Sequence, residues 1–248
     1  MNTATDLQRK RTEVAVGIRE VESPLSRKHQ DVFAEPEQKV ERFSELQIRN
    51  YSGKRLLDLA IGSIAFLAFI LLYPVIAMGI KLSSPGPVIF RQKRTGVFGN
   101  PFTCYKFRTM HLVEKRSENG KPVVTQKGDS RIFSFGQFLR KTNLDELPQI
   151  LNVMKGEMSL VGPRPYPVQE CRYWDGIFDD HFYRYIVTPG ITGYAQARGL
   201  RGGTLEEHAM RKRLDFDLIY TEKNNLAFDV KIIWMTVARM IVRKTNGH

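Results

Sequence analysis

One long apolar run stands out in the pattern of hydrophobic and polar positions along the chain. From Leu59 to Ile80 no residue is charged, and charged residues flank the run on both sides. A helix of this length reaches about 33 Å at roughly 1.5 Å per residue, close to the thickness of the hydrocarbon core of a bilayer. The run therefore predicts a membrane-inserted helix within residues 49–83. The alternative, a core helix, needs more surrounding protein than so short a chain provides.

Pro74 interrupts this run directly after Tyr73. A proline inside a helix removes one hydrogen bond and clashes with the preceding turn, so it kinks or breaks the helix. Each flank of the run carries four basic side chains: Arg42, Arg49, Lys54 and Arg55 before it, and Lys81, Arg91, Lys93 and Arg94 after it. Because basic flanks are rarely translocated, we predict a re-entrant helix that bends at Tyr73–Pro74 and leaves the membrane where it entered. An ordinary span is the alternative.

Shorter periodic segments follow a turn at residues 84–87. Residues 88–96 and 102–110 have the composition of two short strands, which predicts a basic β-hairpin. Apolar positions at helical spacing predict helices in four later segments: residues 133–142, 147–155, about 204–223 and 226–244. The pattern is that of an α/β chain, mostly helical with a small basic hairpin or sheet.

The two ends of the chain differ in character. Residues 1–48 mix both signs of charge without a sustained apolar period, so we expect a flexible polar tail that lacks the features of a secretory signal peptide. Residues 226–244 mix apolar and basic side chains, as an amphipathic helix at a membrane interface does. A terminal helix packed on the core of the domain fits this sequence equally well. The expected domains are the tail, the membrane helix over 49–83 and a cytosolic domain over 84–248.

The charge distribution points to an anionic partner. The 248 residues include 38 Lys and Arg against 26 Asp and Glu, a net charge of +12. Residues 1–50 are neutral, with nine charges of each sign, and no acidic residue occurs between Leu59 and Leu112. Such a field attracts nucleic acid, an anionic membrane leaflet or a phosphorylated substrate. Widely spaced Cys104 and Cys171 and five single histidines predict neither a disulfide framework nor a zinc or His-rich metal site.

Adjacent carboxylates at Asp145 and Glu146 stand just before Pro148, where the first turn of a helix is expected. Acidic residues there often only complement the helix dipole. Two neighbouring carboxylates repel each other, however, unless Arg140 or a divalent metal lies beside them. Such a pair can divide the work, with one oxygen attacking phosphorus while the other holds Mg²⁺.

Two later segments carry candidate phosphate or nucleotide contacts. In GPRP, residues 162–165, two prolines flank Arg164 and stiffen its backbone, so the arginine loses less conformational freedom on binding a phosphate than it would in a flexible loop. A rigid surface turn without a binding role is the alternative interpretation of this motif. The loop over residues 189–199 offers glycines, Tyr194 and Arg198. A flat base could stack on the tyrosine while backbone amides approach phosphate oxygens, but the loop lacks Walker or Rossmann spacing.

Several motifs occur in a fixed order after the apolar run: KRLLDL, SPGPVIFRQKRTG, YKFRTM, LRKTNLDELPQILNVMKGEMSLVGPRP and PGITGYAQARG. This series, from about Lys54 to Thr236, resembles the bacterial sugar transferase family, whose members are monotopic phosphoglycosyl transferases. Asp217, Tyr220 and Asp229 are similar to that family's C-terminal DxxY...D region.

The resemblance implies an activity and a location. A hexose-1-phosphate, of glucose or galactose type, would pass from a UDP-sugar to undecaprenyl phosphate with release of UMP, as the initiating step of exopolysaccharide, capsule or O-antigen synthesis. The catalytic domain would lie on the cytoplasmic face of a bacterial inner membrane. The implied partners are the UDP-sugar, the polyprenyl phosphate and membrane lipid, and a homodimer is left open.

The resemblance also assigns roles to residues. Asp145 would be the nucleophile that forms an aspartyl-phosphosugar, and Glu146 would be its partner, helping to bind Mg²⁺. The expected substrate contacts are Lys106, Arg108, Arg140, Arg164, Tyr194, Gln196 and Arg198. The basic members of this set would offset the negative charge that builds up when a carboxylate attacks a phosphate. Ping-pong kinetics follow from a second displacement by the lipid acceptor.

Two alternatives stay open. In one, Asp145 or Glu146 acts as a general base for direct attack by the lipid phosphate. In the other, the chain is a membrane-bound basic adaptor without catalysis. Nucleic-acid binders interleave basic and aromatic residues along a groove, whereas these basic residues cluster around the expected phosphate contacts, so we expect no nucleic-acid partner.

Overall fold

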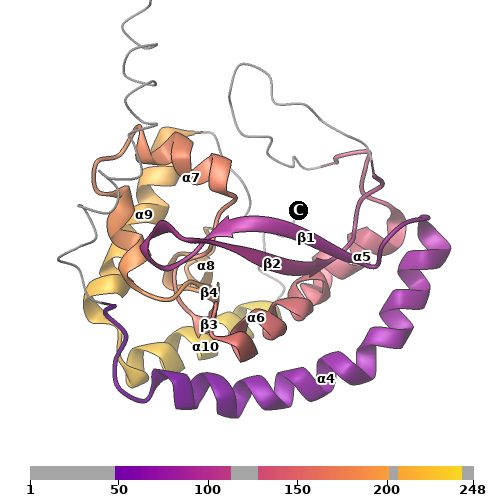
Figure 1. Cartoon of the computed structure of the whole chain (residues 1–248), viewed down its shortest axis with the longest axis horizontal. Coiled ribbons are helices and arrows are strands. Elements are labelled where there is room, and N and C mark those ends of the chain that lie inside the picture. Colours follow the sequence, from indigo (N-terminus) through magenta and orange to yellow (C-terminus); the bar gives the residue numbers. More distant parts are fainter. Residues whose placement is uncertain (1–47, 113–127, 201–205, 242–248) are drawn as a thin grey trace, which may run out of the picture. The chain divides into compact units, whose positions relative to one another are not determined.

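The computed structural model describes residues 48–112, 128–200 and 206–241 of the chain. These residues form a mostly helical structure with two small two-stranded sheets (Figure 1). The mostly helical α/β architecture expected from the sequence is thus confirmed. Of the tail expected over residues 1–48, all but Ile48 lies outside the described residues.

The first described helix, α4 (Lys54–Ser83), contains the whole apolar run. It begins directly after Gly53, whose φ of +91° ends the preceding turn, so it starts later than the expected segment 49–83. The helix continues through Pro74, where the sequence predicted a kink or break, and it curves along its length (Figure 1). Within the described part of the chain, α4 alone is long and apolar enough to cross a membrane.

Most of the apolar surface of α4 is not covered by protein. Its exposed large side chains are Leu56, Ile61, Ile64, Leu67, Ile70, Leu71, Leu72, Tyr73, Val75, Met78 and Leu82. A core helix would bury these side chains, and monomeric soluble proteins rarely expose such a patch. The exposure therefore disfavours the core-helix alternative.

The other side of α4 packs on the domain through small residues. A Cβ on Gly62 would lie 3.5 Å from Met154 Sδ, and one on Gly79 would lie 2.5 Å from the ring of Phe135. Buried Phe69, Ile76 and Ile80 continue this contact into the main hydrophobic core. The inner face of α4 is therefore packed closely against the domain.

The predicted basic hairpin is present. Strand β1 (Ile89–Thr95) pairs antiparallel with β2 (Pro101–Phe107), from Ile89 opposite Phe107 to Thr95 opposite Pro101. A short 3₁₀ helix, η2 (Val97–Gly99), makes the connection. The hairpin brings Lys106, near the end of β2, toward the carboxylates described below.

Those carboxylates lie on the second of three consecutive short helical segments. Helix α5 (Ser134–Thr142) ends at Asn143, whose φ of +59° turns the chain into the 3₁₀ helix η3 (Leu144–Gln149). Helix α6 (Ile150–Lys155) follows and stops at Gly156, with a φ of +83°, where the Lys-Gly pair predicted an end. The expected single helix over residues 147–155 is therefore split between η3 and α6.

A parallel strand pair that the sequence did not predict joins the middle of the chain to its last third. Strand β3 (Ser159–Val161) pairs with β4 (Gly190–Thr192). The backbones approach so closely that a Cβ on Gly162 would lie 2.2 Å from the carbonyl oxygen of Thr188, so the position requires glycine. Between the two strands lie α7 (Val168–Asp175) and the 3₁₀ helix η4 (His181–Ile186).

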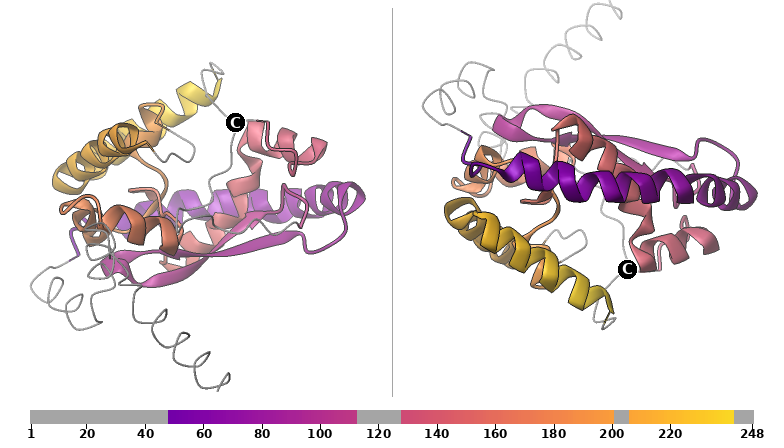
Figure 2. Two further views of the ribbon diagram at one scale, coloured as in Figure 1. Left: turned by 90° about the horizontal axis from the view of Figure 1, so that it is seen from above. Right: turned by 90° about the horizontal axis from the view of Figure 1, so that it is seen from below.

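The chain then continues through three helices: α8 (Tyr194–Ala197), α9 (Glu207–Lys223) and α10 (Leu226–Ile241). On α10, Ile232 is fully buried, whereas Leu226, Val230, Trp234 and Val237 form an exposed apolar stripe at helical spacing. The expected packing of this segment on the core is therefore confirmed for one side, and the membrane interface stays a prediction for the exposed side. Seen from below, α4 and α10 both lie on the side nearest the viewer (Figure 2, right).

Candidate active site

The two adjacent carboxylates lie in the first turn of η3, as the sequence predicted for a helix start. Asp145 and Glu146 are both half-buried. Strand β2 runs past η3 on one side, and the turn after β3 approaches from another, so three separate segments meet here. The basic side chains from these segments decide how each carboxylate behaves.

Glu146 is held by two cations. Lys106 Nζ donates to Glu146 Oε1 at 2.6 Å, and Arg164 Nη2 donates to the same oxygen at 2.7 Å. Burial opposes the negative charge of Glu146, but the charges of Arg164 and Lys106 outweigh it and hold the pKa of this carboxyl well below its usual range. Glu146 therefore stays ionised and neutralises part of the positive charge around it.

Asp145 differs from its neighbour. Its side chain makes no hydrogen bond or ion pair with any residue in the described ranges 48–112, 128–200 and 206–241. Burial, together with the adjacent charge of Glu146, raises the pKa of Asp145 to about 6, against the opposing charges of Lys106, Arg140 and Arg164. Two neighbouring carboxyl groups whose pKa values are pushed apart are typical of sites where the two groups have different tasks.

Arg140 supports Asp145 from α5. Its Nε donates to Thr109 Oγ1 at 2.8 Å, which fixes the guanidinium beside the carboxylate pair. Burial lowers the pKa of Arg140, and the charge of Asp145 partly restores it. The structure therefore brings Asp145, Glu146, Lys106, Arg140 and Arg164 together, as the sequence predicted.

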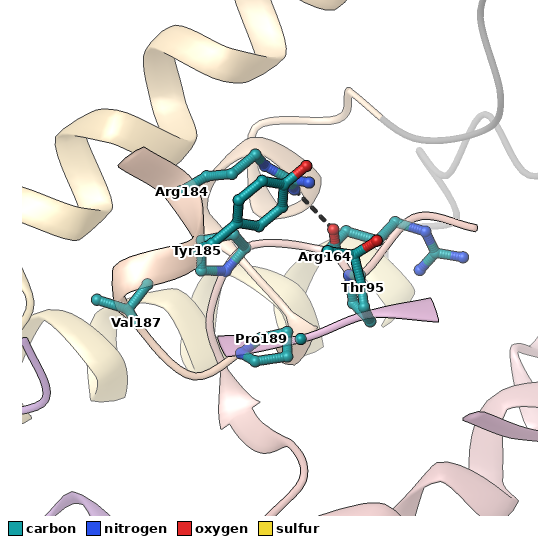
Figure 3. A pocket seen from close by; sticks show the side chains of 9 residues that line it. Thr95, Arg164, Arg184, Tyr185, Val187 and Pro189 are labelled. Carbon is teal, nitrogen blue, oxygen red and sulfur yellow. Dashed lines mark hydrogen bonds between the residues drawn. The ribbon is translucent and has the colours of Figure 1, made fainter. Parts of the chain in front are cut away.

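Arg164 extends from the GPRP turn between β3 and α7. Its guanidinium points away from Arg184 and Tyr185, while its backbone carbonyl faces Arg184 (Figure 3). A small pocket lies on this backbone side, lined by Thr95, Gly96, Pro163, Arg164, Pro165, Arg184, Tyr185, Val187 and Pro189. The side chain that reaches Glu146 and the pocket thus lie on different sides of the turn.

Arg108 is not placed as the sequence predicted. Its side chain is buried and donates to the carbonyl of Pro87 at 2.6 Å and to Oγ and O of Ser84 at 2.8 and 2.6 Å. All these contacts tie the end of α4 to the hairpin, and none reaches the carboxylates. The expected substrate contact is instead a structural contact, because the side chain of Arg108 is directed to the end of α4.

Tyr194, Gln196 and Arg198 are also not gathered at the carboxylates. The expected loop folds as the short helix α8, and the ring of Tyr194 lies edge-on to Phe216 and Phe228, with centroid distances of 5.2 and 5.0 Å. Gln196 is buried and donates to the carbonyl of Ile191, and Arg198 lies over the ring of Phe216. The predicted stacking of a base on Tyr194 is therefore not supported.

The predicted bend in the membrane helix lies close to the end of β2. The ring of Tyr73 is 6.0 Å from that of Phe107 and 5.6 Å from that of Phe69. Phe107 directly follows Lys106, the cation that holds Glu146. Two aromatic contacts, Tyr73 and Phe69 with Phe107, thus join α4 to the end of β2 beside the carboxylate pair.

Sequence reasoning missed two arginines behind the GPRP turn. Arg94 Nη1 donates to the carbonyl of Pro165 at 2.6 Å, and Arg184 Nη2 donates to that of Arg164 at 2.6 Å. Arg94 belongs to the acid-free basic stretch, so charge patterning could have marked it. Arg184 stands alone among aromatic residues and has no local signal.

The carboxylates fit Mg²⁺ when substrate phosphates complete its coordination. No group of three or more His, Cys, Asp or Glu side chains forms a metal cage among the residues described. Mg²⁺ is usually bound through one or two carboxylates together with water and substrate phosphates. Asp145, half-buried and without an ion-pair partner among the described residues, suits such a contact, and Glu146 is adjacent to it.

Comparison with known proteins shows to which family the chain belongs. The family model described as "Bacterial sugar transferase" matches residues 49–243, which is most of the chain. The chain belongs to the bacterial sugar transferase family. The carboxylate pair, the hairpin and the GPRP turn of this sugar transferase all lie inside the matched range.

Three similar relatives carry the name UDP-glucose:undecaprenyl-phosphate glucose-1-phosphate transferase. The one from Xanthomonas campestris pv. campestris is 43% identical over 194 residues, covering 78% of this chain and 40% of the relative. The one from Escherichia coli (strain K12) is 44% identical over 193 residues, covering 77% and 40%. The one from Caulobacter vibrioides is 43% identical over 189 residues, covering 76% and 69%. The chain thus spans about two fifths of the first two sugar transferases.

Proposed function

We propose that the chain transfers a sugar-1-phosphate from a UDP-sugar to undecaprenyl phosphate, with release of UMP, as an initiating step of exopolysaccharide, capsule or O-antigen synthesis. The observation that carries this proposal is the unequal carboxylate pair. Glu146 is engaged by Lys106 and Arg164, whereas Asp145 keeps its oxygens free of protein partners within the described residues. One carboxylate is thus occupied and the other is available to react. Family membership makes a non-catalytic adaptor the weaker alternative.

In the first step, a carboxylate oxygen of Asp145 attacks the phosphorus that carries the sugar. A bond forms between that oxygen and phosphorus, and the bond to the bridging oxygen of the diphosphate breaks. UMP leaves with the electron pair of that bond, and the sugar phosphate stays on Asp145 as an acyl phosphate. Lys106, Arg140 and Arg164 offset the negative charge that would otherwise keep a carboxylate away from the diphosphate.

In the second step, a phosphate oxygen of the lipid acceptor attacks the same phosphorus. The new bond gives a diphosphate-linked sugar lipid, and the bond to Asp145 breaks, which restores the carboxylate. Mg²⁺, held by Asp145 and Glu146 with substrate phosphates, would add positive charge at the diphosphate. No proton has to be removed from the nucleophile, because the reacting form of Asp145 is already the carboxylate.

Trapping the intermediate tests this route against direct displacement. The purified full chain in nanodiscs is incubated with Mg²⁺ and a UDP-sugar labelled in the sugar, without acceptor. We expect label on the protein together with UMP in equal amount, and both should vanish in Asp145→Asn. Asp215→Asn, which changes an exposed carboxylate on α9, is the matched control and should behave as the wild type.

Wild-type UMP release by Asp145→Asn would disprove the assignment of Asp145. Absence of label at saturating donor, with turnover intact once acceptor is added, would favour a direct displacement in which a carboxylate acts as base.

The membrane arrangement that we propose is a re-entrant α4 at the cytoplasmic face of the inner membrane. Basic side chains on both sides of the helix, its curved path through Pro74 and its exposed apolar side support this arrangement. Single cysteines at Ser52 and Pro85, in a background with Cys104 and Cys171 replaced, would be labelled with an impermeant reagent in sealed vesicles. We expect both sites to react from the cytoplasmic side only, and labelling from opposite sides would establish a simple span.

Glucose-1-phosphate is the first candidate for the transferred group. The three relatives described above are named for UDP-glucose, and galactose is the alternative to be tested beside it. Incubating membranes with polyprenyl phosphate, Mg²⁺ and a panel of UDP-sugars, followed by product analysis, identifies the group.

A further inference from the structure

Side chains from other elements bind carbonyl groups of the GPRP turn. Pro163 and Pro165 have no backbone N–H, so the turn cannot be held by the donors of those residues. Backbone bonds hold its first half, from Gly162 N to the carbonyl of Thr192 and from Gly190 N to the carbonyl of Pro163. In its second half, two buried arginines bind the carbonyls: Arg184 binds that of Arg164, and Arg94 binds that of Pro165, each at 2.6 Å. The position of the Arg164 backbone therefore depends on side chains from other elements.

Arg184 is itself held by a buried carboxylate on α9. Arg184 Nη2 and Nε donate to Asp217 Oδ2 at 2.8 and 3.2 Å, and each of the two side chains is only 2% exposed. The guanidinium also lies 4.4 Å from the centroid of the Tyr166 ring. The same guanidinium also donates to the carbonyl of Arg164. Partners on several sides therefore fix the orientation of the planar guanidinium of Arg184.

A buried ion pair of this kind is poorly explained by stability alone. Removing two charges from water costs free energy that their mutual attraction often fails to recover. Apolar residues of similar size in place of the pair frequently give a protein of equal or greater stability. The ion pair with Asp217 does, however, fix the orientation of the Arg184 N–H group that donates to the Arg164 carbonyl. The contacts form an unbroken series from Asp217 through Arg184 and Arg164 to Glu146.

We propose that Arg184 and Asp217 are positioning residues, which hold the backbone of Arg164 so that its guanidinium reaches Glu146 beside the reacting Asp145. This inference rests on the proposed function. It also gives Asp217, the first residue of the DxxY...D pattern, a defined task. Neither residue touches the carboxylate pair, and both act through Arg164.

A second ion pair joins the same two elements and provides a matched control. Arg211 on α9 donates to both oxygens of Asp180, the residue before η4, at 2.7 Å. This pair is partly exposed and has no contact with the GPRP turn in the described residues. Asp180→Asn therefore weakens the link between α9 and η4 without reaching Arg164.

The test is a double-mutant cycle on the full chain in nanodiscs, with kcat and KM for donor measured through UMP release. Arg164→Ala defines which of the two parameters Arg164 controls. We expect Asp217→Asn to change the same parameter in the same direction, by between about tenfold and 100-fold, since a small displacement of a positioning group has costs of that order. Asp217→Asn added to Arg164→Ala should change it by less than about twofold.

Two further variants make the result specific. Asp217→Glu, which keeps the acceptor, should recover most of the activity, whereas Asp180→Asn should keep the wild-type kcat and KM. If Asp217→Asn does not accumulate as folded protein, Arg184→Lys replaces it, because a lysine can pair with Asp217 without bridging to the Arg164 carbonyl. The same criteria then apply.

Independent, multiplicative effects of the two substitutions would overturn the inference, and so would wild-type kinetics in Asp217→Asn. Either result leaves the assignment of Asp145 intact, provided that Asp145→Asn is inactive. UMP release by Asp145→Asn would instead remove the proposed function, so the two failures are distinguishable.

Discussion

Asp145 and Glu146 are adjacent in the chain but receive unequal shares of the surrounding positive charge. One oxygen of Glu146 accepts hydrogen bonds from both Lys106 and Arg164, at 2.6 and 2.7 Å, whereas Asp145 makes no ion pair within the described residues. A carboxylate whose oxygens are occupied is a poor nucleophile, and one without partners is free to approach a phosphorus atom. These contacts therefore support the division of roles that we propose for the two residues.

Lys106→Met should reduce kcat for UMP release by about 10–100-fold, the rate equivalent of losing a charge-assisted hydrogen bond worth about 1.5–3 kcal/mol. The substitution removes one of the two cations on Glu146, so the negative charge near the donor diphosphate rises. Steady-state kinetics in nanodiscs measure the effect. Lys93→Met, which changes an exposed cation on β1 of the same hairpin, should leave kcat unchanged. Equal losses in both variants would assign the effect to the general charge of the hairpin.

Arg108→Met should lower stability rather than substrate affinity. It leaves the carbonyls of Ser84 and Pro87 without their donor in a buried position, at a cost of about 2–4 kcal/mol. Thermal unfolding in nanodiscs should show the loss, while KM for donor at low temperature should match the wild type. Arg91→Met, at an exposed position on β1, is the control for removal of a charge. An increased KM with unchanged thermal stability would restore the role that the sequence predicted.

Features that depend on one continuous stretch of chain could be predicted from the sequence. The apolar run from Leu59 to Ile80 marks α4, and the turn residues between two basic segments mark the hairpin. The carboxylate pair could be found for the same reason, since Asp145 and Glu146 share one motif with the start of η3. Each of these patterns is local, so the structure that it predicts does not depend on contacts with distant parts of the chain.

Features that depend on tertiary contacts could not be predicted in this way. The sequence places Arg108 two residues after Lys106, which suggests a shared role, but the chain leaves β2 there and Arg108 turns to the carbonyls at the end of α4. Tyr194 stands in a glycine-rich segment that could have remained a loop, yet its half-buried ring packs against Phe216 and Phe228 beside the core. The strand pair β3–β4 consists of three-residue strands, too short for an alternating pattern to identify.

Gly136→Ala should displace α5 and disturb the position of Arg140. A Cβ at this position would lie 2.2 Å from the carbonyl oxygen of Thr109, a backbone atom that cannot move without shifting the segment after β2. Thr109 also accepts the hydrogen bond from Arg140 Nε. We expect a loss of about 1–3 kcal/mol or more in stability and a fall in kcat in the folded fraction. Gln137→Ala, exposed on the same helix, should be neutral or slightly stabilising, and a neutral Gly136→Ala would show that the two segments separate easily.

His181 should make the fold sensitive to mild acid. Its ring is fully buried, with Nδ1 2.6 Å from Asp175 Oδ1, and burial lowers the pKa of His181 below its usual value of 6.5. A depressed pKa means that the unfolded chain binds the proton more readily than the folded one. The stability that this provides is fully present above about pH 6.5 and is lost as the pH falls through the pKa of the folded state.

Thermal unfolding of His181→Gln across the same pH range tests this dependence. The variant should be less stable at neutral pH, and its stability should fall less steeply than that of the wild type as the pH is lowered. His208→Gln, at an exposed position on α9, should keep the wild-type profile. Identical slopes in His181→Gln and the wild type would assign the acid sensitivity to other groups.

The exposed apolar stripe on α10 should contact lipid. Trp234 is 70% exposed in the middle of that stripe, and the only other tryptophan, Trp174, is fully buried and stacked on Phe178. Trp174→Phe leaves Trp234 as the single fluorophore, and Trp234→Phe leaves Trp174. In nanodiscs with brominated lipid, emission from Trp234 should be quenched and blue-shifted, because an amphipathic indole settles at the level of the headgroups. Emission from Trp174 should be insensitive to bromine and reports that the fold is intact. An unquenched Trp234 beside an intact Trp174 would place α10 in water and leave α4 as the lipid contact of this domain.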